Sequence, residues 1–159
     1  MGYIIRFANK EDVRSIHNLI TELAVFEKEP DAVEVTIADL EVEGFSDNPK
    51  FKTFVAEEEG EIVGMALFYE RFSTWKGKTI HLEDLIVTKS KRELGIGKAL
   101  YSKLMTYAYE NDYKRVAWDV LDWNINAINF YKNSGATVLE EWRVVHMNEQ
   151  SLEAFVNKL

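Results

Sequence analysis

Apolar and polar residues follow two different periods along this chain. Alternation with period two predicts strands, and apolar residues spaced three or four apart predict amphipathic helices. Alternation predicts seven strands, at residues 3–8, 51–57, 62–72, 79–87, 116–121, 136–139 and 142–147. The helical period predicts five helices, one running from the N-cap Asn9 to Phe26 and the others at residues 37–44, 97–111, 124–134 and 151–158.

Local signals support these boundaries. Asn9 and Thr36 are N-cap residue types that directly precede helical patterns. Glu59-Gly60 predicts the turn of a hairpin between two strands, and Gly135 ends the fourth helix. The resulting order, β-α-α-β-β-β-α-β-α-β-β, predicts an α/β (α+β) fold in which helices cover both faces of a mixed sheet.

Length and composition limit the possibilities further. The 159 residues, 47% of them hydrophobic, suit one domain over residues 1–159 with a substantial core. The chain has no cysteine, which excludes disulfides, thiolate metal sites and a cysteine nucleophile. His17, His81 and His146 are scattered without ligand spacing, so we predict no metal site.

The formal net charge of −8 argues against a nucleic-acid partner, because phosphate contacts need a basic surface. It is compatible with a small cationic substrate, although a solvated acidic surface accounts for it equally well. No apolar run approaches the ~18 residues of a membrane span, and no signal-peptide pattern opens the chain. We therefore predict a cytoplasmic protein without a membrane partner.

One segment carries a candidate binding motif. The apolar strand that contains Glu83 and Asp84 is followed by a loop in which Arg92, Gly95 and Gly97 form the pattern Arg-x-x-Gly-x-Gly, and then by a long helix. A glycine-containing loop at a helix start is an anion site, because backbone N–H groups point outward there and the helix dipole favours negative charge.

Other phosphate-binding motifs do not fit this loop. A Walker A loop needs glycine at position 92 and serine or threonine at position 99, where the chain has Arg92 and Ala99. A dinucleotide fingerprint needs a small residue where Leu100 stands. An ordinary strand–loop–helix connection remains open on this pattern alone.

Glu83 and Asp84 are the second candidate feature, since two adjacent acids are uncommon in an apolar strand. An unpaired buried carboxylate is costly. Alternation sends neighbouring side chains to opposite faces of a sheet, so we expect these two carboxylates to be separated rather than to form a pair. The alternative is that one is exposed and the other caps a loop.

Three stretches together resemble one enzyme family. They are residues 73–84, the loop at 92–97, and Leu121-Asp122-Trp123-Asn124 followed by Asn129-Phe130-Tyr131-Lys132. They are similar to the GNAT-family N-acetyltransferases, in particular the diamine (spermidine/spermine) acetyltransferases and most closely the thialysine acetyltransferase branch. The resemblance runs from Ile5 to the C-terminus, and it implies the GNAT fold, a mixed, mostly antiparallel sheet of about seven strands.

The resemblance also implies acetyl-CoA as co-substrate and no metal. The residues it assigns to acetyl-CoA are Leu85, Ile86, Val87, Arg92, Glu93, Leu94, Gly95, Ile96, Gly97, Lys98, Asn124 and Tyr131. The first three lie along the pantetheine, one of their amides polarising the thioester carbonyl, and the loop holds the pyrophosphate. Asn124 also fits the role of an ordinary helix N-cap, and it can fill both roles. Glu93 departs from the family pattern, which often has glycine there; we expect its side chain to point to solvent.

Catalytic roles follow from the same resemblance. Glu83 is the expected base, acting through a water, because an alkyl ammonium with a pKa near ~10.4 must lose a proton. Asp84 is expected to accept the substrate amine. Tyr131 is the expected acid for the departing thiolate, with core packing as the alternative role for a helical tyrosine.

For substrate recognition the resemblance implies Phe26, Glu27, Glu83, Asp84, Trp118, Asp119 and Glu141, the last through a loose match. The polyamine branch has an acid where this chain has Ser73, which favours a small amine carrying a carboxylate, such as thialysine or a lysine-like amino acid. The resemblance also implies a homodimer. We therefore expect acetylation of a small primary amine by direct attack in a ternary complex. The alternatives are a non-catalytic acyl-CoA-binding module and an enzyme acting on protein amines.

Overall fold

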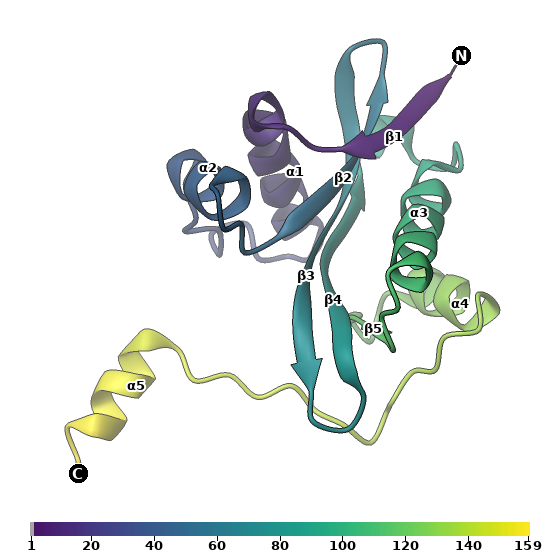
Figure 1. Cartoon of the computed structure of the whole chain (residues 1–159). Coiled ribbons are helices and arrows are strands. Elements are labelled where there is room, and N and C mark those ends of the chain that lie inside the picture. Colours follow the sequence, from purple (N-terminus) through teal and green to yellow (C-terminus); the bar gives the residue numbers. More distant parts are fainter. Residues whose placement is uncertain (1) are drawn as a thin grey trace. The chain divides into compact units, whose positions relative to one another are not determined.

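The computed structural model describes residues 2–159 and divides the chain into two compact units, one up to Asp119 and one from Val120 (Figure 1). The first unit holds a five-stranded sheet in the order β1-β2-β3-β4-β5. Its strands are β1 (Tyr3–Phe7), β2 (Lys52–Glu58), β3 (Glu61–Ser73), β4 (Gly77–Val87) and β5 (Val116–Ala117). Neighbouring strands are antiparallel except for β4 and β5, which are parallel.

Helices cover both faces of this sheet, as the sequence predicts. α1 (Val13–Phe26) and α2 (Ile37–Phe45) pack on one face, and α3 (Ile96–Glu110) packs on the other (Figure 1). Two short 3₁₀ turns, η1 (Lys10–Asp12) and η2 (Lys89–Lys91), precede α1 and follow β4. The mixed, mostly antiparallel α/β fold is therefore confirmed.

Each face of the sheet has its own hydrophobic core, and the helical residues in each core follow helical spacing. Under α1 and α2 the buried side chains include those of Val13, Ile16, Leu19 and Leu40. Under α3 they include those of Ile96, Leu100, Leu104 and Ala108. Both sets recur at helical spacing, which places one stripe of each helix against the sheet.

The caps form largely as predicted. The Thr36 side chain accepts from the backbone N–H of Asp39, and the Asp39 carboxylate accepts from the Thr36 N–H in return. At η1 the Asp12 carboxylate accepts from the Asn9 N–H, while Asp12 N donates to the Asn9 backbone carbonyl. The α-helix itself begins at Val13.

The second unit differs from the prediction. It contains α4 (Ile125–Asn133) and α5 (Glu149–Val156), but residues 136–139 and 142–147 form no strand, and the sheet has five strands rather than seven. A strand needs a neighbour to pair with, and its apparent propensity depends on that context. The apolar side chains in this segment are exposed instead; they are those of Leu139, Trp142, Val144, Val145 and Met147.

The predicted strand at residues 116–121 is also shorter, since only Val116–Ala117 pairs. The helices of residues 2–159 all lack the length and the apolar run that crossing a bilayer requires.

Candidate active site

The ladder between β3 and β4 is irregular at the two adjacent acids. Asp84 lies opposite Leu67, but the next pair is Leu82 with Phe68, so Glu83 has no counterpart on β3. An extra residue of this kind is a β-bulge, which interrupts the alternation of side chains along its strand.

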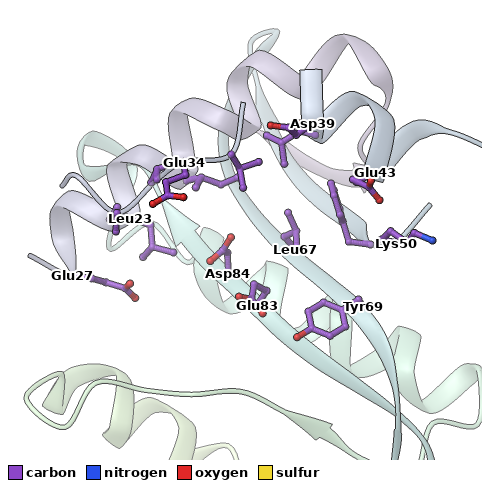
Figure 2. Close-up of a pocket in the computed structure, with 17 residues that line it drawn as sticks. Leu23, Glu27, Glu34, Asp39, Glu43, Lys50, Leu67, Tyr69, Glu83 and Asp84 are labelled. Atoms are coloured by element: carbon purple, nitrogen blue, oxygen red, sulfur yellow. The ribbon is translucent and has the colours of Figure 1, made fainter. Parts of the chain in front are cut away.

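The core shows the effect of the bulge. The β4 side chains that pack under α3 are those of Ile80, Leu82, Leu85 and Val87, so the phase of alternation changes between 82 and 85. As a result Glu83 and Asp84 both face the side of α1 and α2, next to each other (Figure 2). The prediction that they occupy opposite faces is therefore wrong, because strict alternation takes no account of a bulge.

The two carboxylates line a cavity of about 740 Å³ bounded by α1, α2, β3 and β4 (Figure 2). Its wall is mostly apolar, with side chains such as Ile20, Leu23 and Leu67. Six carboxylates also line it, those of Glu27, Glu34, Asp39, Glu43, Glu83 and Asp84, and Lys50 is the lining residue with a positive charge. A pocket with this charge balance suits a cation with an apolar stem.

Asp84 is the perturbed acid of the cavity. Burial raises its pKa to about 7, and the negative charges of Glu83 and Glu27 add to the effect. Burial also raises the pKa of Glu27. Within residues 2–159 the Asp84 carboxylate has no hydrogen-bond or ion-pair partner, so nothing in the described chain compensates its charge.

Glu83, in contrast, is held by neighbours. Arg71 Nη1 lies 3.1 Å from His81 Nδ1, and His81 Nε2 lies 3.4 Å from Glu83 Oε2. Since a guanidinium only donates, Nδ1 accepts, and the N–H of a neutral His81 is on Nε2, where it faces Glu83. The Tyr69 hydroxyl is directed toward Glu83 (Figure 2), and burial followed by the Glu83 charge raises the Tyr69 pKa.

The loop after β4 has the geometry of an anion site. Gly95 has a φ of 81°, and the first hydrogen bond of α3 runs from Ala99 N to Gly95 O over 3.0 Å. The N–H groups of Ile96, Gly97 and Lys98 therefore have no partner in their own helix. A Cβ built on Gly97 comes no closer than 3.6 Å to its neighbours, so the protein itself leaves space beside that backbone. These features fit the diphosphate of a bound nucleotide.

Two charged residues of this loop differ in what they do. Glu93 is exposed, as expected, and has a φ of 67°, a left-handed conformation that favours glycine. Arg92 donates from Nε to the Val87 carbonyl over 2.9 Å, and its guanidinium lies 5.1 Å from the centre of the Phe26 ring. Arg92 therefore joins the end of α1 to the end of β4 in this structure.

Glu22 of α1 was not predicted, although it holds the same connection. Its carboxylate accepts from Thr88 Oγ1 and from Lys89 N, each over 2.8 Å, and lies 3.6 Å from Arg92 Nη2. The sequence carries no signal for this role, because Glu22 is one of many polar residues on an amphipathic helix.

Beyond His81, β4 pairs with β3 alone among the described strands, since the ladder with β5 consists of Ile80 with Val116 and His81 with Ala117. The predicted pantetheine segment, Leu85 to Val87, lies in this part of β4. An edge without a strand partner offers backbone N–H and C=O groups to a ligand.

The remaining predicted residues of the first unit do not all lie at the cavity. Glu27 lines the cavity, whereas Phe26 contacts Arg92. Trp118 packs edge-to-face on Tyr101 of α3, with ring centroids 5.7 Å apart, in the core away from the cavity. Asp119 is near enough to Tyr69 for its charge to contribute to the raised Tyr69 pKa.

The other three predicted residues belong to the second unit. Asn124 caps α4, its Oδ1 accepting from Ala127 N over 3.3 Å. Tyr131 lies on α4, with its ring edge-to-face to that of Phe130 at 5.4 Å. Glu141 is exposed in the segment between α4 and α5 that forms no strand.

Sequence reasoning missed several lining residues of the cavity: Glu34, Asp39, Glu43, Lys50 and Tyr69. They come from four segments that only the folded sheet brings together. The three acids among them share one signal, the density of acids between residues 27 and 43, whereas Lys50 and Tyr69 have none.

The first unit thus has two features suited to ligands of opposite charge: the acid-lined cavity beside Glu83 and Asp84, and the helix start at Gly95 to Lys98. Residues 11–136 match the Acetyltransferase (GNAT) family, and the chain belongs to this family. The predicted family and its acetyltransferase class are thereby confirmed.

Individual relatives agree. The chain is 34% identical to the thialysine N-epsilon-acetyltransferase of Bos taurus over 98% of both chains. It is 36% identical to the spermidine/spermine N(1)-acetyltransferase-like protein 1 of Homo sapiens over 93% of this chain, which spans 23% of that protein. A solved integron cassette protein from the mobile metagenome of V. cholerae has the same fold, with a TM-score of 0.79 at 24% identity over 98% of each chain.

Proposed function

We propose that this chain is an acetyl-CoA-dependent N-acetyltransferase that acts on the primary amine of a small molecule, with thialysine or a lysine-like amino acid preferred over a long polyamine. The observation that carries the proposal is the pair Glu83 and Asp84, turned by the bulge into one cavity on the strand that leads to the anion-binding loop. A cationic amine fits the cavity, and a diphosphate fits the loop.

The preference for a small amino acid has two supports. Ser73 stands where the polyamine branch has an acid, which removes one contact for a long polycation. Lys50 also lines the cavity beside the acidic residues, and its positive charge suits a substrate carboxylate. The similarity to a thialysine N-epsilon-acetyltransferase over nearly the whole chain agrees with this choice.

When bound, acetyl-CoA supplies an acetyl group activated as a thioester. The N–H groups at the start of α3, with Arg92, Gly95, Gly97 and Lys98, hold the pyrophosphate, and the β4 backbone from Leu85 to Val87 lies along the pantetheine. One of these amides polarises the thioester carbonyl. Asn124 contacts the cofactor arm in this proposal, as the resemblance implies.

The chain then has three proton transfers to perform. A carboxylate of the pair takes one proton from the substrate ammonium and frees the nitrogen lone pair, which attacks the thioester carbon. As the C–S bond breaks, Tyr131 gives a proton to the departing thiolate, and the nitrogen gives up its second proton, which restores the phenol. No acyl-enzyme is formed, so both substrates are present at the same time. The resemblance gives the first transfer to Glu83 through a water.

The test is thiol release from acetyl-CoA with purified protein and a panel of thialysine, lysine, ornithine, putrescine, spermidine and a lysine-containing peptide. We expect release above the hydrolysis background with thialysine or lysine, less with spermidine, and none with the double variant Glu83→Gln/Asp84→Asn. Binding of acetyl-CoA without release for any amine would favour a non-catalytic module, and release with the peptide alone would favour a protein acetyltransferase.

We further propose a cytoplasmic homodimer. The support is the number of exposed apolar side chains in residues 139–159, among them Trp142, Val145 and Leu152, since association would remove them from water. Sedimentation equilibrium should give twice the chain mass, and a monomer at micromolar concentration would contradict this.

A further inference from the structure

We infer that Asp84, rather than Glu83, accepts the proton of the substrate ammonium, and that Glu83 is a positioning residue that holds the cation beside it. The inference rests on the proposed function and divides the roles within that same site.

The geometry distinguishes the two acids. Glu83 faces His81 Nε2 at 3.4 Å, His81 is in turn bonded to Arg71, and the Tyr69 hydroxyl is directed toward the same carboxylate (Figure 2). These contacts hold the Glu83 carboxylate in place beside His81. Asp84 has no hydrogen-bond partner within residues 2–159, so its lone pairs are available to an incoming N–H.

The surroundings make Asp84 the better matched acceptor. Its pKa is raised to about 7 by burial and by its acidic neighbours, and a base is most effective when its pKa lies near the working pH. The titratable or charged groups of the cavity come from the C-cap of α1, the connection to α2, α2 itself, the segment before β2, and strands β3 and β4: Glu27, Glu34, Asp39, Glu43, Lys50, Tyr69 and Glu83. Of these, the carboxylates of Glu83 and Glu27 disfavour a negative charge on Asp84.

The proton step balances without another reactant. The N–H bond of the ammonium breaks, its electron pair stays on nitrogen as the nucleophilic lone pair, and the proton forms an O–H bond with Asp84. The proton leaves to solvent after the product departs, which returns the carboxylate.

The experiment compares pH profiles of kcat/KM for the wild type, Asp84→Asn and Glu83→Gln. In the wild type the acidic limb should bend near pH 7 instead of rising toward the pKa of the free amine. Asp84→Asn should lower kcat by 100-fold or more and move that bend toward the pKa of the amine.

The direction in which Glu83→Gln moves the bend distinguishes the two assignments. If Asp84 is the base, removal of the Glu83 charge lowers the Asp84 pKa, so the bend persists and moves to lower pH, while KM for the amine rises. Glu27→Gln should shift the bend in the same direction, since Glu27 acts on Asp84 through charge as well. Loss of the bend in Glu83→Gln, with the bend retained in Asp84→Asn, would overturn the inference.

A second substrate separates catalysis from misfolding. A fluorinated primary amine that is neutral at the assay pH needs no base to free its lone pair, so Asp84→Asn should retain most of its activity on that amine. An equal loss on both amines would contradict the assignment. Failure of every amine to raise thiol release by the wild type above the hydrolysis background would overturn the proposed function itself, whereas a wild type that acetylates amines through Glu83 overturns this inference alone.

Discussion

The Asp84 carboxylate shows how one residue can favour function over stability. Its pKa is raised from 3.8 to about 7 in the folded chain, so between these pH values the native state binds more protons than the unfolded state. Stability linked to Asp84 is therefore complete at low pH and is lost as the pH rises through about 7.

Asp84→Asn should consequently stabilise the fold at pH 8, by up to about 4 kcal/mol for a shift of this size, and have little effect at pH 4. Thermal unfolding at the two pH values measures the difference. Asp31→Asn, at an exposed loop position, is the matched control and should be neutral at both. An equal gain at pH 4 and pH 8 would show that the charge of Asp84 is not the cause.

Glu93 is a second residue whose backbone and charge both oppose the proposed ligand. A non-glycine residue with a φ of 67° costs on the order of 1 kcal/mol, and its carboxylate lies in a loop proposed to hold a diphosphate. Glu93→Gly should lower the KM for acetyl-CoA several-fold, and Glu93→Gln, which removes only the charge, should lower it less. Steady-state kinetics with acetyl-CoA varied at saturating amine test this, and a higher KM for Glu93→Gly would contradict it.

Among the elements, α1 links the cavity to the nucleotide loop. It contributes Leu23 to the cavity wall and, from the neighbouring position, Glu22 to the connection after β4. Motion at one site should therefore be felt at the other, because the same rigid helix carries both residues.

Glu22→Gln tests this link, because the amide keeps one acceptor but loses the charge that faces Arg92 and the second acceptor for Lys89 N. We expect a several-fold rise in the KM for acetyl-CoA, a smaller change for the amine, and a loss of about 1–2 kcal/mol in stability. Glu29→Gln, an exposed neighbour beyond the end of the helix, should change none of these. Equal effects of Glu22→Gln on both KM values would indicate a general loss of structure.

The elements also show where sequence reasoning succeeds. Helices with a clear apolar stripe are found well, because their pattern is local: α3 lies within one residue of its predicted ends, and α1 ends at Phe26 as predicted but begins three residues late, after the 3₁₀ turn η1. The β4 bulge cannot be predicted in this way, since no residue type in 82–85 is specific to a bulge. It becomes visible only from the pairing with β3, where Glu83 has no counterpart. Consequently Glu83 and Asp84 were selected as candidates, but their shared cavity was not predicted.

At the scale of the whole molecule, the same limit applies to the segment after Gly135. Its alternation is genuine, but a strand forms only where a neighbour offers backbone groups, and residues 136–147 form no strand in the described chain. The helix start after the loop at residues 92–97 is confirmed for the opposite reason, because the glycines and the first helical residues lie within a few positions of each other.

The whole-molecule charge gives the last prediction. The chain has a formal net charge of −8, and six carboxylates line the cavity, so a long-range field should draw cationic amines toward it. Salt screens such a field within about 10 Å at 0.1 M ionic strength. The KM for a dicationic amine such as putrescine should therefore rise several-fold between 0.05 and 0.5 M sodium chloride. The KM for thialysine, which carries one net positive charge, should rise less, and that for the anionic acetyl-CoA should not rise through this long-range field. Parallel salt dependences for the two amines would mean that short-range contacts inside the cavity, rather than the field of the molecule, govern amine binding.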